Sequence, residues 1–100
     1  MWIGVGRLVL DFYNNDDAAD KRRRLETLCK DLRRKFNLSM LEVADHDDPE
    51  RGVVGFAIVM KEDLREEQAK SLVQKVCEEI DSTAPGRVTV TDWDILSHGD

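Results

Sequence analysis

The amino-acid sequence predicts an α+β domain in which two helices cover one face of a four-stranded antiparallel sheet. Four short runs are rich in β-branched and aromatic residues, and two longer segments repeat apolar residues at helical spacing. In chain order the elements are strand, helix, strand, strand, helix and strand, the arrangement of the ferredoxin-like sandwich. Right-handed crossovers then place the strands in the order 4-1-3-2.

Length and composition are those of one domain. The 100 residues can bury one sheet-and-helix core and are too few for a second, so we expect a single domain over residues 1–100. No apolar run approaches the roughly 20 residues that cross a bilayer, and the N-terminus lacks a basic region followed by a cleavage site. We therefore expect a cytoplasmic protein with no membrane partner.

The first three elements lie before residue 44. Residues 2–12 are apolar and β-branched, which predicts a strand. A helix over roughly 18–36 is predicted from a capping Asp17, an acid at Asp20 and an apolar stripe. Residues 38–43 predict a short strand, and the polar segment after it contains Pro49, a turn signal. The stripe consists of Leu25, Leu28, Cys29, Leu32 and Phe36.

The second half repeats this alternation. Residues 52–60 carry no charge and predict a central strand. Asp63 and Glu66 have the spacing of a capping box before a second helix, and "APG" at 84–86 ends that helix. Residues 87–96 predict the last strand. The stripe of the second helix consists of Ala69, Leu72, Val73, Val76, Cys77 and Ile80.

The uncovered face of the sheet is predicted to join two copies of the chain. Arg7 and Glu42 are charges inside strands, and a charged side chain rarely points into a core unpaired, so both are taken to mark this face. The apolar residues beside them form a patch that is large for an isolated monomer. We expect a homodimer interface that contains Ile3, Val5, Arg7, Val9, Leu38, Met40, Val53 and Val59.

Four segments follow one another in a distinctive order: GVGRLVLDF, DKRRRLETLCKDLRRKFNLSMLEVADHD, GVVGFAIV and VTDWDIL. Across nearly the whole chain they resemble the YlxP-like family, small bacterial proteins catalogued as a domain of unknown function. The resemblance implies a ferredoxin-like fold, a cytoplasmic setting and genes beside those for translation and ribosome-maturation factors. It supplies no catalytic residues, and the segment YNNDD looks shorter and more acidic than the family's usual loop.

Enzyme mechanisms lack essential groups in this sequence. Acylphosphatases share the fold and need an arginine after the first strand, where this chain has Asp16 and Asp17, which would repel phosphate. We interpret His46 and its neighbouring aspartates as a turn, with a divalent metal site as the less favoured alternative. Cys29 and Cys77 lie on apolar stripes and lack metal-ligand spacing. We expect no enzyme, no catalytic residue, no metal and no cofactor.

The sheet also lacks the aromatic platform of RNA-recognition domains. Their third strand carries aromatics that stack on bases. The corresponding segment here is "RGVVGF" at 51–56, where Val53 and Gly55 stand at the stacking positions. Recognition of RNA by the sheet face is therefore unfavourable.

The first helix is the basic part of an acidic chain. Residues 18–36 hold eight Lys and Arg against three Asp and Glu, a net of +5, which leaves −11 for the rest of a chain of net charge −6. At 100° per residue, Arg23, Lys30 and Arg34 line up opposite the apolar stripe. Arg22 and Arg33 lie on one shoulder, and Arg24 and Lys35 on the other.

This basic face predicts contact with ribosomal RNA or with a ribosomal or translation protein. The residues expected to bind are Arg22, Arg23, Lys30, Arg33 and Arg34. One alternative is a solvated helix face with pairs four residues apart, such as Glu26 with Lys30. Another is an ACT-like module that binds a small ligand between paired sheets. Lys21 and Arg22 are expected to cover the edge of the core with their stems while their charges reach water.

Overall fold

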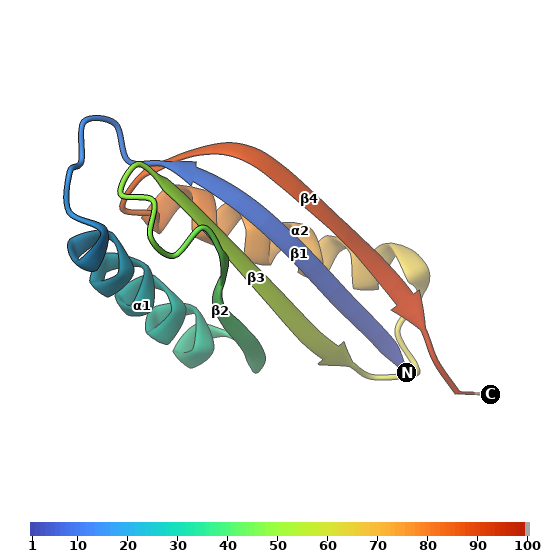
Figure 1. Ribbon diagram of the computed structural model, residues 1–100. Helices are drawn as coiled ribbons and strands as arrows, with labels where there is room; N and C mark the ends of the chain where they lie inside the picture. The colour runs from blue at the N-terminus through green and yellow to red at the C-terminus, as the bar shows by residue number, and fades with distance from the viewer. Residues whose placement is uncertain (100) are drawn as a thin grey trace.

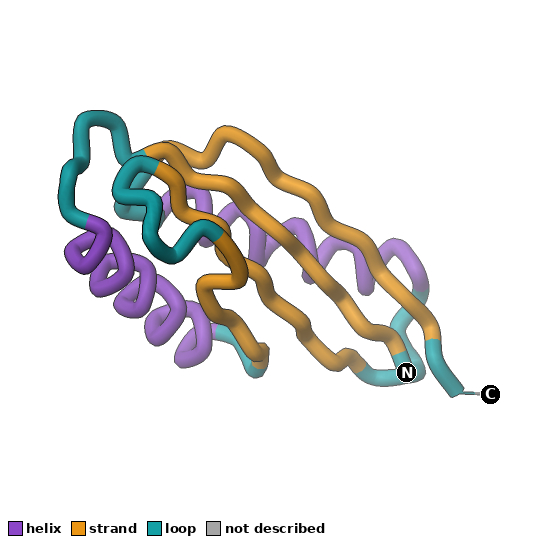
Figure 2. Tube along the Cα trace, in the orientation of Figure 1, coloured by secondary structure: helices purple, strands orange, loops and turns teal. Residues whose placement is uncertain are grey.

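The computed structural model describes residues 1–99 and has the predicted element order and strand order. The sheet is antiparallel in the order β2-β3-β1-β4, and both helices lie against one of its faces (Figure 1). Figure 2 shows the loops gathered at the two ends of the long strands. The ferredoxin-like fold is therefore confirmed. The elements are β1 (Trp2–Asp11), α1 (Ala18–Lys35), β2 (Leu38–Ala44), β3 (Arg51–Met60), α2 (Glu66–Thr83) and β4 (Arg87–Ser97).

The helix N-termini match the sequence prediction at α1 and differ at α2. Asp17 caps α1, because its Oδ1 accepts from the backbone N–H of Ala19 at 3.0 Å. The N-cap of α2 is Arg65, whose N–H donates to the side chain of Gln68 at 2.8 Å. Asp63 lies in the turn after β3, so the predicted capping box there is wrong.

The core lies between the helices and the inward face of the sheet. Leu8 and Leu10 of β1 are completely buried, as are Leu25 and Leu32 of α1. A Cβ added to Gly6 would lie 2.2 Å from the Phe56 ring, so the ring lies across β1 where only glycine leaves room. The further members of this cluster include Phe12, Leu28, Cys29, Met40, Val54, Ile58, Met60, Ala69, Val73, Val76, Cys77 and Ile80.

The predicted face of β2 is wrong. Met40 is 2% exposed and belongs to the core cluster, and Leu38 packs against it. Glu42 therefore lies on the helix side, where Lys21 of α1 neutralises it. The rule that a strand charge marks the open face fails here because the charge has a buried partner of opposite sign. Leu38 and Met40 cannot form the proposed interface.

Strands β1 and β3 have the predicted faces. Arg7 is exposed, and the inward residues of β3 are Phe56, Ile58 and Met60, as expected. Val9 and Val53 are register partners outside the main cluster and are 5% and 0% exposed, so a second copy would gain little from covering them. No helix within residues 1–99 is long and apolar enough to cross a membrane.

Candidate functional site: helix α1 and the open sheet face

The two shoulders of α1 contact the rest of the fold. On one shoulder, Arg33 Nη1 donates to the carbonyl of Met40 in β2 at 2.6 Å. On the other, Arg24 Nη2 donates to Pro85 O at 2.8 Å, and Lys35 pairs with Glu79 of α2. These cations hold the helix against its neighbours. Much of the excess positive charge of the helix therefore belongs to side chains that already contact the fold.

Lys21 is the centre of a buried polar network at the start of α1. Its side chain is 0% exposed, which contradicts the expected snorkelling to water. Nζ donates to Asp45 O at 2.6 Å and to Arg51 O at 2.9 Å, and it lies 3.1 Å from Glu42 Oε2. Glu42 Oε2 is buried without a well-aligned hydrogen bond, so the ion pair with Lys21 is what compensates its burial.

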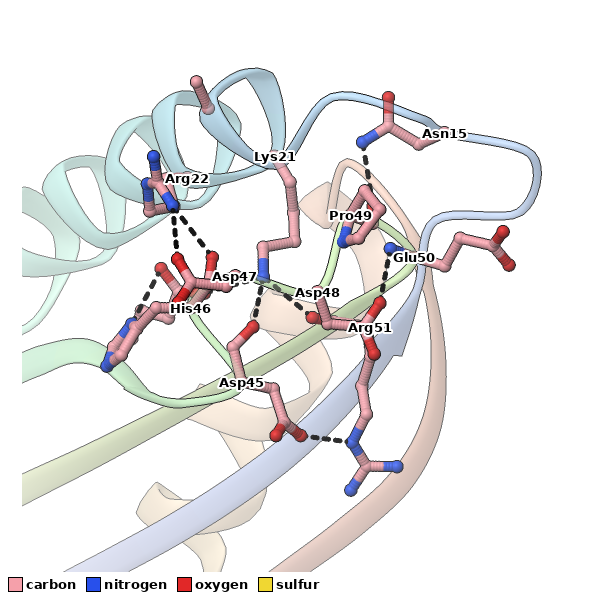
Figure 3. A network of polar contacts seen from close by, with 12 residues as sticks. Asn15, Lys21, Arg22, Asp45, His46, Asp47, Asp48, Pro49, Glu50 and Arg51 are labelled. Carbon is pink, nitrogen blue, oxygen red and sulfur yellow. Dashed lines mark hydrogen bonds and ion pairs between the residues drawn. The ribbon is translucent and has the colours of Figure 1, made fainter.

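The loop between β2 and β3 is built around this network (Figure 3). Arg22 Nη1 donates to His46 O at 3.0 Å, and Arg51 Nε donates to Asp45 Oδ2 at 2.6 Å. His46 Nδ1 lies 3.3 Å from Glu42 Oε1. Arg22, predicted to bind a partner, is thus occupied by the loop. Within residues 1–99 no group of three His, Cys, Asp or Glu side chains could hold a metal ion.

The outward line of α1 contains the three cations that were predicted there. Arg23 and Arg34 have 71% and 80% of their side chains exposed. Arg23 pairs with Asp20, and Arg34 lies 4.0 Å from Asp31, at the limit of an ion pair. Lys30 is exposed and has no ion pair to any residue in 1–99. The structure therefore separates the five predicted contacts: Arg23, Lys30 and Arg34 point outward, while Arg22 and Arg33 contact the fold.

The open face of the sheet has apolar register partners at one end and a charged residue beside a glycine in the middle. At one end, Ile3 pairs with Val59 of β3 and Leu96 of β4, and Val59 and Leu96 are 66% and 51% exposed. In the middle, Arg7 is opposite Gly55 and Asp92. The predicted interface did not include Leu41, Val43, Val90 and Leu96, which lie on the strands and are each about half exposed. Leu41 and Val43 were missed because β2 was assigned the wrong face.

A hollow of about 370 Å³ lies beside Arg7 on this face. Its lining includes Gly55 and Ala57 of β3, Leu41 and Val43 of β2, and Arg7 itself. A Cβ on Gly55 would meet Val43 Cγ1 at 3.0 Å, so the glycine also lets Val43 lie close to β3. A protruding cation and a depression are thus neighbours on adjacent strands.

The two cysteines are core residues, as predicted. Burial raises the pKa of both thiols from 9.0 to about 11, and the charge of Glu26 adds to the effect at Cys29. The thiolate, which is the nucleophilic form, is therefore scarce at neutral pH. Neither side chain is suited to covalent catalysis.

Two solved structures are similar in fold. One is a Deinococcus radiodurans protein provisionally described as an antibiotic biosynthesis monooxygenase, at 17% identity over 100% of this chain and 94% of its own, with a TM-score of 0.45. The other is a de novo designed protein with a ferredoxin fold, at 14% identity over 98% and 87%, with a TM-score of 0.47. No curated protein is significantly similar to this chain. Residues 3–94 match the model of the family described as "Protein of unknown function (DUF503)", and the chain belongs to that family.

Proposed function

We propose that the protein is a non-enzymatic binding protein whose helix α1 contacts a polyanion, ribosomal RNA in a translation or ribosome-maturation setting. The genes that accompany the YlxP-like proteins, which this chain resembles, suggest the setting. The observation that carries the proposal is the outward line of Arg23, Lys30 and Arg34. Helix α1 lies in the layer away from the open sheet face (Figure 1), and the Arg23 and Arg34 side chains are 71% and 80% exposed.

The spacing of these residues suits a phosphate backbone. Positions 23, 30 and 34 fall on one side of the helix, two and then one turn apart, or roughly 10 Å and 6 Å along its axis. Asp20 and Asp31 lie beside the line and partly neutralise it. The proposal therefore concerns weak, salt-sensitive binding through about three phosphates. Further contacts with other parts of the RNA or with a ribosomal protein would add to the affinity.

The test is charge reversal of the outward line in the full-length chain. The variant Arg23→Glu/Lys30→Glu/Arg34→Glu should lose co-sedimentation with small ribosomal subunits at low salt. A matched control, Lys61→Glu/Lys70→Glu/Lys75→Glu, changes the net charge equally away from α1. For three phosphate contacts, raising salt from about 50 to 200 mM should weaken wild-type binding roughly 20- to 40-fold. Equal binding by both variants would contradict the proposal.

A further inference from the structure

We propose that the open sheet face docks on the same face of a second copy, with the Arg7 side chain of each protomer seated in the Gly55 hollow of the other. The starting observation is the middle row of the face, in which Arg7 and Gly55 are register partners on neighbouring strands. Arg7 contributes a long charged side chain and Gly55 contributes none.

A two-fold interface must be complementary to itself, because each residue that contacts a partner position is contacted by it in return. A two-fold axis along the strands, between β1 and β3, places β1 of one copy over β3 of the other. Arg7 then meets Gly55, and the outward Ile3 meets Val59. The protrusion and the depression flank this axis, which is where a self-complementary surface needs them.

The residues around the hollow fit this use. Asp92 of β4 is directly opposite Arg7 in the same protomer, so a carboxylate would accompany the guanidinium into the interface. Arg7 has no ion pair within 4 Å among residues 1–99, which leaves its guanidinium available. Ala57, Leu41 and Val43 line the hollow with apolar groups, against which the aliphatic part of the Arg7 side chain of the other copy could pack.

The area of the face is that of a small dimer interface. Four strands spaced about 4.8 Å apart, with about ten residues of 3.3 Å each, give a flat footprint of roughly 600 Å². Val9 and Val53 are already covered at one end of the face, so each copy would bury less than the roughly 800 Å² of a standard interface. The exposed Val59, Leu96 and Leu41 supply apolar contact across it.

The sheet edges are less suited to a second copy. In edge strand β2 the carbonyl of Met40 is occupied by Arg33, and in edge strand β4 the N–H of Ile95 is occupied by the Asp94 carboxylate at 2.8 Å. Backbone groups that are already bonded offer less to an added strand. The open face is thus favoured over the edges as the meeting surface.

The test compares Ala57→Trp with Ala19→Trp by light scattering after size exclusion. Both positions are exposed, but residue 57 fills the hollow while residue 19 lies on α1. Wild type and Ala19→Trp should have twice the 11.5 kDa mass of one chain, and Ala57→Trp should be monomeric. A monomeric wild type, or a dimeric Ala57→Trp variant, would overturn the proposal.

A mixing experiment tests the Arg7 contact itself. In a mixture of Ala57→Trp with Val5→Ala/Arg7→Ala, the indole of one chain meets shortened residues 5 and 7, because the axis places residue 5 over position 57, and the Arg7 of that chain meets an intact hollow. The mixture should form heterodimers, detected by native mass spectrometry, more than either variant forms homodimers. No heterodimer would exclude this geometry. Charge reversal on α1 should leave the mass unchanged, so this result and the RNA proposal succeed or fail separately.

Discussion

Replacing Lys21 by methionine should be among the most damaging single changes in the chain. Methionine nearly preserves the volume of the side chain but removes three contacts of Nζ, to Asp45 O, Arg51 O and Glu42 Oε2. It leaves the buried Oε2 of Glu42, whose side chain is 12% exposed, without its ion-pair partner, and only His46 Nδ1, 3.3 Å from Oε1, remains beside the carboxylate. Breaking one partner of a buried pair typically costs about 3–5 kcal/mol.

That loss is large against the total stability of a small domain, which is about 5–15 kcal/mol. With a urea m-value of about 1.2 kcal/mol per M, the unfolding midpoint should fall by roughly 2.5–4 M. The assay is urea unfolding followed by circular dichroism at neutral pH. Lys30→Met, an exposed position on the same helix, is the control and should change the free energy of unfolding by less than about 0.5 kcal/mol.

A second variant separates the lost charge from the lost packing. Lys21→Met/Glu42→Gln removes the orphaned carboxylate, so it should be more stable than Lys21→Met alone even though it carries two changes. If Lys21→Met loses less than about 1 kcal/mol, the ammonium reaches water and the buried network described above is incorrect. If the double variant is less stable than the single one, the unpaired charge of Glu42 is not the source of the cost.

Two further predictions concern the core. Gly6→Ala should destabilise the domain by about 1–3 kcal/mol in urea unfolding, because the new methyl group overlaps the Phe56 ring; an unchanged midpoint would show that the ring can turn aside. The raised pKa values of Cys29 and Cys77 mean that the unfolded chain loses these protons first as pH rises, so they contribute a loss of stability between about pH 9 and 11. A Cys29→Ala/Cys77→Ala variant should show a shallower decline over that range, and an equal slope would contradict the assignment.

Most of the fold could be predicted because local signals and tertiary packing agree. The stripe of α1 predicted its buried side, and Leu25 and Leu32 are completely buried. The face of β2 could not be predicted, because alternation alone does not say which of two apolar rows is inward. Resolving it required knowing that Lys21, distant in sequence, neutralises Glu42.

The outward line of α1 was predictable for the same reason that its buried stripe was, since both follow from helical periodicity. What periodicity could not show is that Arg22 and Arg33 contact a loop and a strand carbonyl. Periodicity could not predict the hollow beside Arg7 either. That depression depends on strand register, which brings Gly55 opposite Arg7.

The bonded backbone groups on edge strands β2 and β4 affect how many copies of the chain can associate. A sheet with free edges can add strands without limit, which is the route to fibres. Arg33 and Asp94 take up backbone groups on the two edges, and a face-to-face contact of two-fold symmetry uses up its own surface when it forms. A face-to-face dimer would therefore close at two copies, while Arg33 and Asp94 each remove one backbone group from the edges at which further strands could pair.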